Sequence, residues 1–383
     1  MSEPSNSQSP NANRSPPSRK VNAKLVILSR YDRQGASSRL RTMQYLPYLE
    51  AAGFDVEIAS FFDADYLDAL YSKRATKRSM ASYFSGRLGQ LWRARKADVI
   101  WVEKEALPWV PWPIERLVYP AKVPLVSDYD DAVFHRYDLN RKGLVRWLLG
   151  RKIDGLMAAS RTVFAGNSYL AERARTAGAP SVETVPTVVD TCAYGWQPDP
   201  APDGKLRIGW IGTPQTWAEF GVPMMGMLKA AVQDQGAIIR AVGAGSPTQP
   251  ISGFEFPAWS EDSEIALIQG MDIGIMPLPD TPWARGKCGY KLIQYMACGL
   301  PVIASPVGVN RQIVEHGING FLAETEADWA NALATLLADP VLRRRMGDAG
   351  RLKVEQQFSL RVFGPKVARM LLAVAGQERG SRR

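Results

Sequence analysis

The sequence is poor in the residues that build metal centres and disulfide frameworks. It has two histidines, His135 and His316, and three cysteines, Cys192, Cys288 and Cys298. A zinc site based on histidine is therefore excluded, and both histidines are interpreted as surface or packing residues. The cysteines are odd in number and have no metal-like spacing, which predicts reduced intracellular thiols. No run of about 18 apolar residues occurs, so no transmembrane helix is expected.

The first residues also lack the apolar segment of a secretory signal. Residues 1–22 are rich in Ser, Pro and Asn, which predicts a disordered tail. We therefore expect a cytoplasmic protein. With 383 residues and 46% hydrophobic residues, the chain is long enough for two domains with real cores.

The net charge of +9 is confined to the first part of the chain. Residues 1–152 contain 25 Lys+Arg and 16 Asp+Glu, whereas residues 153–383 contain 22 of each. A solvated basic surface explains this, but so does a partner that is an anionic membrane surface, a phosphorylated acceptor or nucleic acid. Nucleic acid is the weakest of these, because no nucleic-acid-binding motif accompanies the charge, and we expect no nucleic-acid partner. The membrane alternative predicts peripheral association at the inner membrane face.

Short apolar runs alternate with amphipathic stretches along the whole chain, which predicts an α/β protein with parallel sheets covered on both faces. The first series of expected strands covers residues 24–29, 55–62, 98–102, 124–127 and 162–165, with a helix capped by Ser37 or Ser38 after the first. The second series covers 206–211, 237–242, 254–257, 272–276 and 301–304. A final helix is expected from Pro365 to Ala375.

We therefore predict two Rossmann-like doubly wound domains that face each other across a cleft. The N-terminal, acceptor-side domain covers 23–195, a Pro/Asp/Gly-rich linker 196–205, and the C-terminal domain 206–358. Residues 359–383 form a helix that packs back on the N-terminal domain, and a tail. Ligands of such folds bind at the carboxyl ends of the strands.

Two polar segments follow expected strands of the first domain. The turn around Gly35 and Ser37 leaves backbone amides free for an anion, and Arg39 and Arg41 add charge, although a plain strand–helix turn explains it too. The run from Asp128 to Asp131 holds three carboxylates in four residues. Helix capping, hydrogen bonding to sugar or acceptor hydroxyls, and Mg²⁺ binding all remain open for it.

The second domain contains two further candidates. Gly212 and Thr213 follow its first strand and allow close approach of a phosphate. In the stretch from Arg285 to Gly308, Gly286 and Gly289 are expected to open a helix with Lys287 and Lys291 in its first turns. Because lysines there oppose the helix dipole, they indicate a bound anion, and Gln294 is placed to bond a ribose.

The stretch from Gly286 to Gly308, followed by Gly317–Gly320, resembles the nucleotide-sugar-binding signature of family-4 retaining glycosyltransferases, which have the two-domain GT-B fold. The resemblance extends over about residues 24–358. The family normally carries two glutamates in this signature, one for the sugar hydroxyls and one for the ribose; here Gly286 and Gln294 occupy those positions. The Arg and Lys that usually clamp the diphosphate after the Gly209–Gly212 strand are absent as well.

The resemblance implies a glycosyltransferase that moves a sugar from a nucleotide-diphosphate sugar to a glycan or lipid-linked acceptor in cell-surface polysaccharide synthesis. It further implies retention of configuration, no metal and no cofactor, with the leaving phosphate accepting the acceptor's proton. The alternative is a catalytically weak GT-B scaffold that binds a nucleotide sugar or a protein partner. The residues assigned to catalysis are Lys287, Lys291 and Asp131, and those assigned to donor binding are Gly35, Ser37, Arg39, Gly212, Thr213, Cys288, Gly289 and Gln294.

The acceptor side is expected where aromatic and basic residues gather. Residues 104–120 are rich in Trp and Pro, and residues 73–78 and 93–96 are basic. This combination is typical of a peripheral enzyme at a membrane interface, although burial of the Trp side chains under a loop explains it too.

Overall fold

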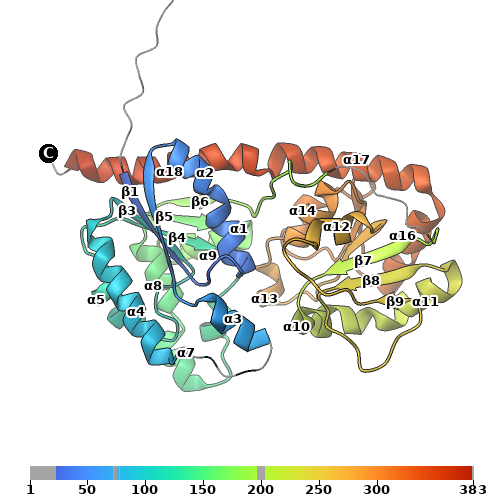
Figure 1. Cartoon of the computed structure of the whole chain (residues 1–383), viewed down its shortest axis with the longest axis horizontal. Helices are drawn as coiled ribbons and strands as arrows, with labels where there is room; N and C mark the ends of the chain where they lie inside the picture. The colour runs from blue at the N-terminus through green and yellow to red at the C-terminus, as the bar shows by residue number, and fades with distance from the viewer. Residues whose placement is uncertain (1–22, 72–73, 75, 77, 196–202, 382–383) are drawn as a thin grey trace, which may run out of the picture.

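The computed structural model describes residues 23–71, 74, 76, 78–195 and 203–381. It contains two six-stranded sheets in which every pairing is parallel, with strand orders β2-β1-β3-β4-β5-β6 and β12-β11-β10-β7-β8-β9. Figure 1 shows the two sheets side by side, each flanked by helices. The predicted fold class, two Rossmann-like domains, is confirmed.

The N-terminal sheet is formed by β1 (Ala23–Ser29), β2 (Phe54–Ser60), β3 (Val99–Glu103), β4 (Leu125–Tyr129), β5 (Thr162–Ala165) and β6 (Val182–Thr184). Its helices are α1 (Ala36–Arg41), α2 (Leu46–Ala51), α3 (Ala64–Tyr71), α4 (Met80–Arg93), α5 (Trp112–Val118), α6 (His135–Asp138), α7 (Gly143–Leu149), α8 (Lys152–Ala159) and α9 (Ser168–Thr176). The central strands β1, β3 and β4 are mostly apolar and are buried along almost their whole length, because helices cover both their faces.

The C-terminal sheet is formed by β7 (Arg207–Ile211), β8 (Ile238–Val242), β9 (Phe254–Glu255), β10 (Ile273–Met276), β11 (Val302–Ala304) and β12 (Gly320–Leu322). Its helices are α10 (Pro214–Thr216), α11 (Met225–Gln235), α12 (Glu264–Gln269), α13 (Pro282–Arg285), α14 (Tyr290–Ala297), α15 (Asn310–Ile313), α16 (Glu326–Ala338) and α17 (Pro340–Gln357). The edge strands β6 and β12 were not predicted. Both are short edge strands whose residues are mostly exposed or half-buried, so they lack the buried apolar run that marks most of the other strands.

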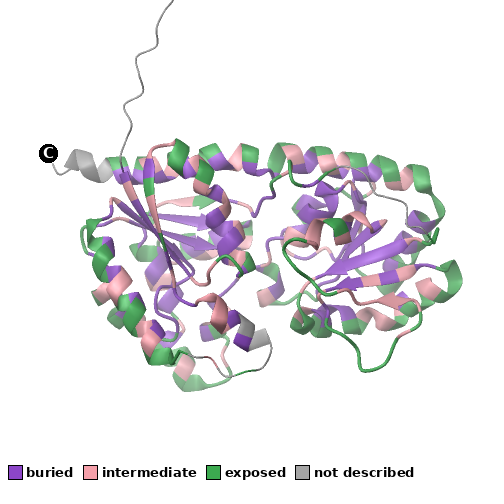
Figure 2. Cartoon of the chain, viewed as in Figure 1, coloured by how far each residue is buried: buried purple, intermediate pink, exposed green. Residues whose placement is uncertain are grey.

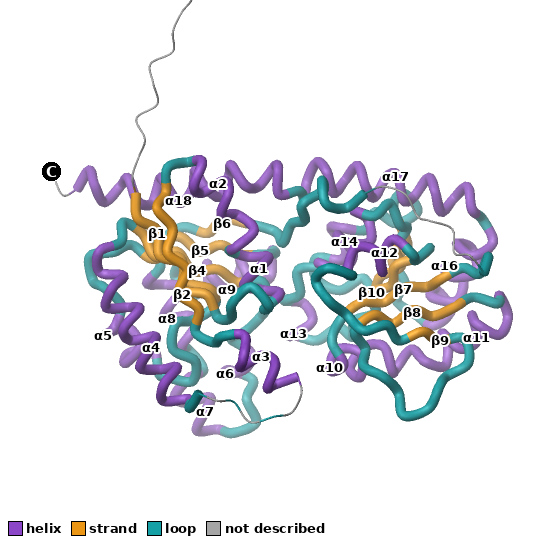
Figure 3. The backbone as a smooth tube through the Cα atoms, viewed as in Figure 1, coloured by secondary structure: helices purple, strands orange, loops and turns teal. Residues whose placement is uncertain are grey.

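The last helix, α18 (Leu360–Ser381), leaves the C-terminal domain and runs along the N-terminal one (Figure 3). Its residues Val367 and Leu371 share a core with Leu25 and Trp101. The prediction that Pro365 opens this helix is wrong: the helix begins at Leu360 and contains Pro365. The predicted tail 1–22 and most of the predicted linker, 196–202, lie outside the described residues.

Figure 2 shows that buried residues concentrate on the strands and on the helix faces toward them. None of the helices in the described ranges is long and apolar enough to cross a membrane. The segments that follow the strands are the polar part of the interior, and those of the two domains meet at the domain boundary, as described next.

Candidate nucleotide-sugar site at the domain boundary

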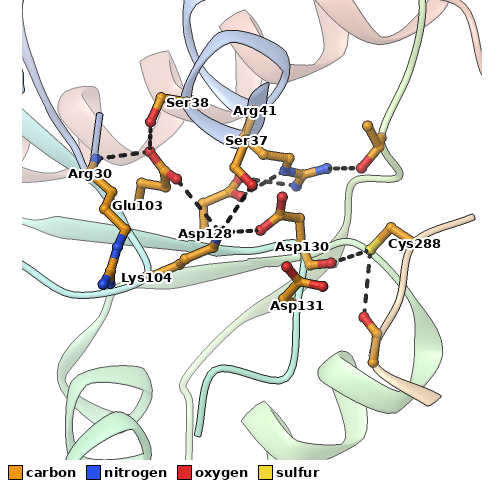
Figure 4. A network of polar contacts seen from close by, with 12 residues as sticks. Arg30, Ser37, Ser38, Arg41, Glu103, Lys104, Asp128, Asp130, Asp131 and Cys288 are labelled. Atoms are coloured by element: carbon orange, nitrogen blue, oxygen red, sulfur yellow. Dashed lines mark hydrogen bonds and ion pairs between the residues drawn. The ribbon is translucent and has the colours of Figure 1, made fainter. Parts of the chain in front are cut away.

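The carboxylates of the Asp128–Asp131 run each pair with a different cation, and Figure 4 shows the pairs of Asp128 and Asp130. Arg41 donates Nε and Nη2 to the two oxygens of Asp128, at 2.8 and 3.0 Å. Lys104 Nζ lies 2.9 Å from Asp130 Oδ1, and its charge and that of Arg41 hold the pKa of Asp130 low against the opposing effect of burial. These pairings offset part of the repulsion among the three carboxylates, and none of the three caps a helix in the described structure: α6 has Phe134 at its N-cap.

Asp128 is a structural residue, because its carboxylate is fully engaged with Arg41 inside the protein. Asp131 differs, because its partner belongs to the other domain. Lys287 Nζ lies 2.9 Å from Asp131 Oδ1, and both side chains are about a quarter exposed, at 23% and 24%. Asp131 and Lys287, both assigned to catalysis from the sequence, therefore meet at the domain boundary.

The loop that carries Lys287 is fastened to the N-terminal domain by further bonds. Asn167 donates Nδ2 to the carbonyls of Gly286 and Lys287, at 3.0 and 2.9 Å, while its Oδ1 caps α9. The Cys288 thiol donates to the Asp130 carbonyl at 3.0 Å, and burial raises the pKa of that thiol. Cys288 is thus a buried packing thiol, and Asn167 is a positioning residue that the sequence did not reveal.

Helix α14 begins three residues later than predicted. Gly286 ends α13, Lys287 and Cys288 lie in the connecting loop, and Gly289 is the N-cap of α14 with a left-handed φ of 67°. Only glycine adopts that backbone without strain. The expectation that Gly286 opens the helix is wrong. Lys287 lies in the loop before the helix, although it is close in sequence to the residues whose amides form the helix N-terminus.

Gly286 lies where the two domains touch. A Cβ at this position would collide with Ala132, at 2.7 Å from its backbone nitrogen. The two domains approach so closely here that no carboxylate side chain fits at position 286 in this arrangement.

Lys291, in the first turn of α14, lies on an aromatic ring of the C-terminal domain. Its Nζ is 4.4 Å from the centre of the Trp210 ring, and no carboxylate of the described residues is within ion-pairing distance. Burial, together with the nearby charge of Lys287, lowers the pKa of Lys291 to about 7. A half-buried cation that lacks a counter-ion among the described residues, at a helix N-terminus, is suited to attract an anion.

Gly212 and Thr213 lie beside the same tryptophan. A Cβ at Gly212 would collide with the Trp210 ring, and its amide donates to the Val242 carbonyl at 3.0 Å. Thr213 caps the short helix α10 in a reciprocal arrangement with Thr216. The structure thus places both residues close to the ring on which Lys291 lies.

The N-terminal turn contacts the C-terminal domain through Arg39. Gly35, and not Ser37 or Ser38 as expected, is the N-cap of α1. Ser38 donates instead to Glu103 at 2.6 Å, and Ser37 accepts from Lys104 at 3.1 Å (Figure 4). Arg39 reaches Glu261 at 3.4 Å and lies 5.7 Å from the Trp259 ring, so it does not contact Lys287 or Lys291.

Gln294 belongs to a polar cluster between α14 and α12. It is buried and donates Nε2 to Glu264 Oε1 at 2.7 Å and to Tyr194 Oη at 3.1 Å. Glu264 also accepts from Trp259 Nε1 at 2.7 Å, and burial raises the pKa of Glu264. A carboxylate therefore lies within hydrogen-bond distance of position 294, although it comes from α12. Sequence reasoning missed Glu264 because only the fold brings α12 beside α14.

The remaining predicted features have local roles. His135 bonds Asp138 and Tyr169, and His316 accepts from the Leu322 amide, so both are packing residues. The three cysteines are free. Within the described ranges no group of three or more His, Cys, Asp or Glu is arranged to hold a metal ion. Of the basic run 73–78, only 74, 76 and 78 are among the described residues.

Two parallel-sheet domains thus meet through Asp131 and Lys287, and the half-buried Lys291 lies at a helix N-terminus with no carboxylate partner among the described residues. Residues 208–339 match the family model described as glycosyl transferases group 1. The whole chain superposes on sucrose-phosphate synthase from Thermosynechococcus elongatus with a TM-score of 0.71 and 15% identity, covering 93% of this chain and 100% of that one. For the Anabaena HepE complex with UDP-glucose, the TM-score is 0.69, the identity 15% and the coverage 92% and 100%.

Curated relatives match over shorter segments. N-acetyl-alpha-D-glucosaminyl L-malate synthase of Bacillus anthracis is 38% identical over 72 residues, which is 18% of this chain and 19% of that protein. D-inositol 3-phosphate glycosyltransferase of Stackebrandtia nassauensis is 27% identical over 178 residues, 41% of this chain and 39% of that protein. The matches thus span less than half the length of these relatives. The chain shares its two-domain GT-B fold with these solved structures, and its C-terminal domain matches the glycosyl transferases group 1 model over residues 208–339.

Proposed function

We propose that the chain is a glycosyltransferase that moves a sugar from a nucleotide-diphosphate sugar to a glycan or lipid-linked acceptor in cell-surface polysaccharide or glycolipid synthesis. The observation that carries this proposal is Lys291, a half-buried ammonium that lies on Trp210, feels the charge of Lys287 and has no carboxylate partner among the described residues. A diphosphate bound at the N-terminus of α14 supplies the missing negative charge.

In the proposed reaction, the bond between the anomeric carbon and the diphosphate oxygen breaks, and its electron pair leaves with the diphosphate. Lys287, Lys291 and the amides at the start of α14 stabilise the charge that develops on that oxygen. The acceptor hydroxyl oxygen bonds to the anomeric carbon on the face that the diphosphate leaves, and its proton passes to a diphosphate oxygen. This is retention of configuration without a metal or cofactor, and it requires no carboxylate nucleophile.

The other site residues have positioning roles in this proposal. Gln294 and Glu264 hold the ribose hydroxyls, because their polar atoms lie at one end of α14 and are 2.7 Å apart. Asp131 faces the donor sugar once the diphosphate attracts Lys287. Gly212 and Thr213 let the diphosphate approach the turn after β7, and Gly35, Ser37 and Arg39 close the opposite side.

A panel of nucleotide diphosphates tests the donor site. We expect one of UDP, GDP and ADP to raise the melting temperature of the full chain. At a hundredfold excess over Kd, that nucleotide should add about 2.7 kcal/mol to the free energy of unfolding. Lys287→Ala should abolish both this stabilisation and sugar transfer or donor hydrolysis. No stabilisation by any nucleotide, together with no hydrolysis of any donor, would overturn the proposal.

A second candidate, a catalytically weak scaffold that binds a nucleotide sugar or a partner, is favoured by one observation. The Nε2 group of Gln294 already donates hydrogen bonds to Glu264 and Tyr194, and Gly286 has no side chain. These two residues stand where the family carries its glutamates, so neither glutamate is present. The scaffold predicts nucleotide binding without turnover of any donor, whereas the enzyme predicts both.

A further inference from the structure

Helix α7 exposes large apolar side chains to solvent. Leu144, Trp147 and Leu148 are 66%, 79% and 45% exposed, and Leu139, just before the helix, is 56% exposed. Only Leu149 of this helix is buried in the domain core. Figure 2 shows the exposed helix at the lower edge of the N-terminal domain. Contiguous apolar exposure of this kind marks an interaction surface.

The charges around these apolar residues are all positive. No Asp or Glu occurs between residues 139 and 153, whereas Arg141, Lys142, Arg146 and Arg151 are exposed there. The acidic residues that flank the segment, Asp138 and Asp154, both pair with Arg173, at 3.1 and 2.6 Å. The nearest carboxylates are thus bound elsewhere, and the basic charge of the segment remains uncompensated by its neighbours.

An apolar ridge with a cationic rim is complementary to an anionic lipid surface. The apolar side chains enter the boundary of the acyl chains, and the cations stay at the headgroups, where each is favoured by attraction to anionic lipid. Tryptophan prefers this boundary because its ring is apolar and its N–H is polar. A protein partner would need a matching apolar groove lined with carboxylates; a bilayer offers both properties without further structure.

We propose that α7 and its flanking cations dock the N-terminal domain on an anionic bilayer. The segment 104–120, selected for this role from the sequence, also exposes large apolar side chains, since Trp109, Ile114 and Leu117 are 55%, 56% and 83% exposed, whereas Trp112 packs on Gly155 of α8. The docking helix follows α6, which begins four residues after Asp131. A bilayer at α7 would therefore lie on the side of the domain from which a lipid-linked acceptor reaches Asp131, an orientation that rests on the proposed function.

Sedimentation with vesicles tests the docking surface and needs neither nucleotide nor acceptor. The full chain should pellet with vesicles of phosphatidylcholine and phosphatidylglycerol and far less with phosphatidylcholine alone. Leu144→Ser/Trp147→Ser/Leu148→Ser should lower the partition coefficient at least about tenfold. Arg141→Gln/Lys142→Gln/Arg151→Gln should lower it about a hundredfold on the anionic vesicles. The control, Val341→Ser/Leu352→Ser on α17, removes comparably exposed apolar residues, 77% and 54% exposed, and should bind like the wild type.

A second measurement locates the helix in the bilayer. Lipids brominated in the acyl chain should quench tryptophan fluorescence of the wild type and quench Trp147→Phe less, with equal melting temperatures for both proteins. The proposal is overturned if the wild type stays in the supernatant, if the triple serine variant binds equally well, or if gel filtration shows a dimer that this variant dissociates. In that last case a second copy of the chain covers α7. None of these failures affects nucleotide binding, so they are distinguishable from failure of the proposed function.

Discussion

The ammonium of Lys291 lies 4.4 Å from the centre of the Trp210 ring and belongs to a helix N-terminus that already carries a partial positive charge. Burial and the charge of Lys287 disfavour the charged form and lower the pKa of Lys291 to about 7, and the helix dipole also opposes a cation at this end. The charged form of Lys291 therefore reduces the stability of the free protein, and a bound anion would offset this cost.

Lys291→Met should therefore stabilise the protein and abolish nucleotide binding. The folded pKa of Lys291 is below that of the unfolded chain, so the unfavourable contribution is fully present below pH 7 and disappears as the pH rises toward the unfolded pKa. We expect Lys291→Met to melt a few degrees higher, about 2–4 °C, at pH 6–7, with a smaller difference at pH 9. Lys291→Arg, which stays charged, is the control and should gain no stability. A lower melting temperature for Lys291→Met would mean that the lysine has a stabilising structural role.

The affinity for nucleoside diphosphates should fall with pH. Above pH 7.5 the terminal phosphate is already ionised, so the titrating group is Lys291, which loses its proton in the free protein above about pH 7. The dissociation constant should rise by up to about tenfold per pH unit between pH 7.5 and 9.5. Calorimetry at several pH values measures this slope, and Lys291→Arg should flatten it. An equal slope in both proteins would assign the titration to another group.

The ion pair between Lys287 and Asp131 should oppose diphosphate binding. Asp131→Asn removes the competing carboxylate, so we expect nucleoside diphosphate to bind about two- to fivefold tighter, as for loss of a partly exposed pair. Sugar transfer should fall by about a hundredfold or more, because Asp131 is proposed to face the donor sugar. This split between tighter product binding and a lower kcat distinguishes a role in positioning from a purely structural role. Asp280→Asn, which removes an exposed ion pair with Arg285, is the control and should leave both quantities unchanged.

Much of the fold was readable from the sequence, because buried parallel strands are continuous apolar runs between amphipathic helices. The strand after Ser160 was predicted residue by residue, at Thr162–Ala165. The pairing of Asp131 with Lys287 was not readable, since the two residues are 156 positions apart and meet only where the domains touch. Likewise, the expected serine cap of α1 failed because Glu103, from a strand 65 residues away, accepts the Ser38 hydroxyl.

The carboxylate of Glu264 should be responsible for recognition of the ribose. It is hydrogen-bonded to Gln294 and Trp259, and the proposed function places the ribose hydroxyls at this cluster. Wild type should bind a ribonucleoside diphosphate more tightly than its 2′-deoxy analogue, by about tenfold for one charge-assisted hydrogen bond.

Glu264→Gln should reduce this preference to near unity by weakening the ribonucleotide alone, whereas a merely structural Glu264 would weaken both ligands equally. Glu261→Gln is the matched control, because Glu261 lies nearby but bonds to Arg33 and Arg39 instead of Gln294. It should keep the preference for ribose. If Glu264→Gln also keeps it, the ribose is held elsewhere, and the proximity of the α12 carboxylate to Gln294 serves only to join the two helices.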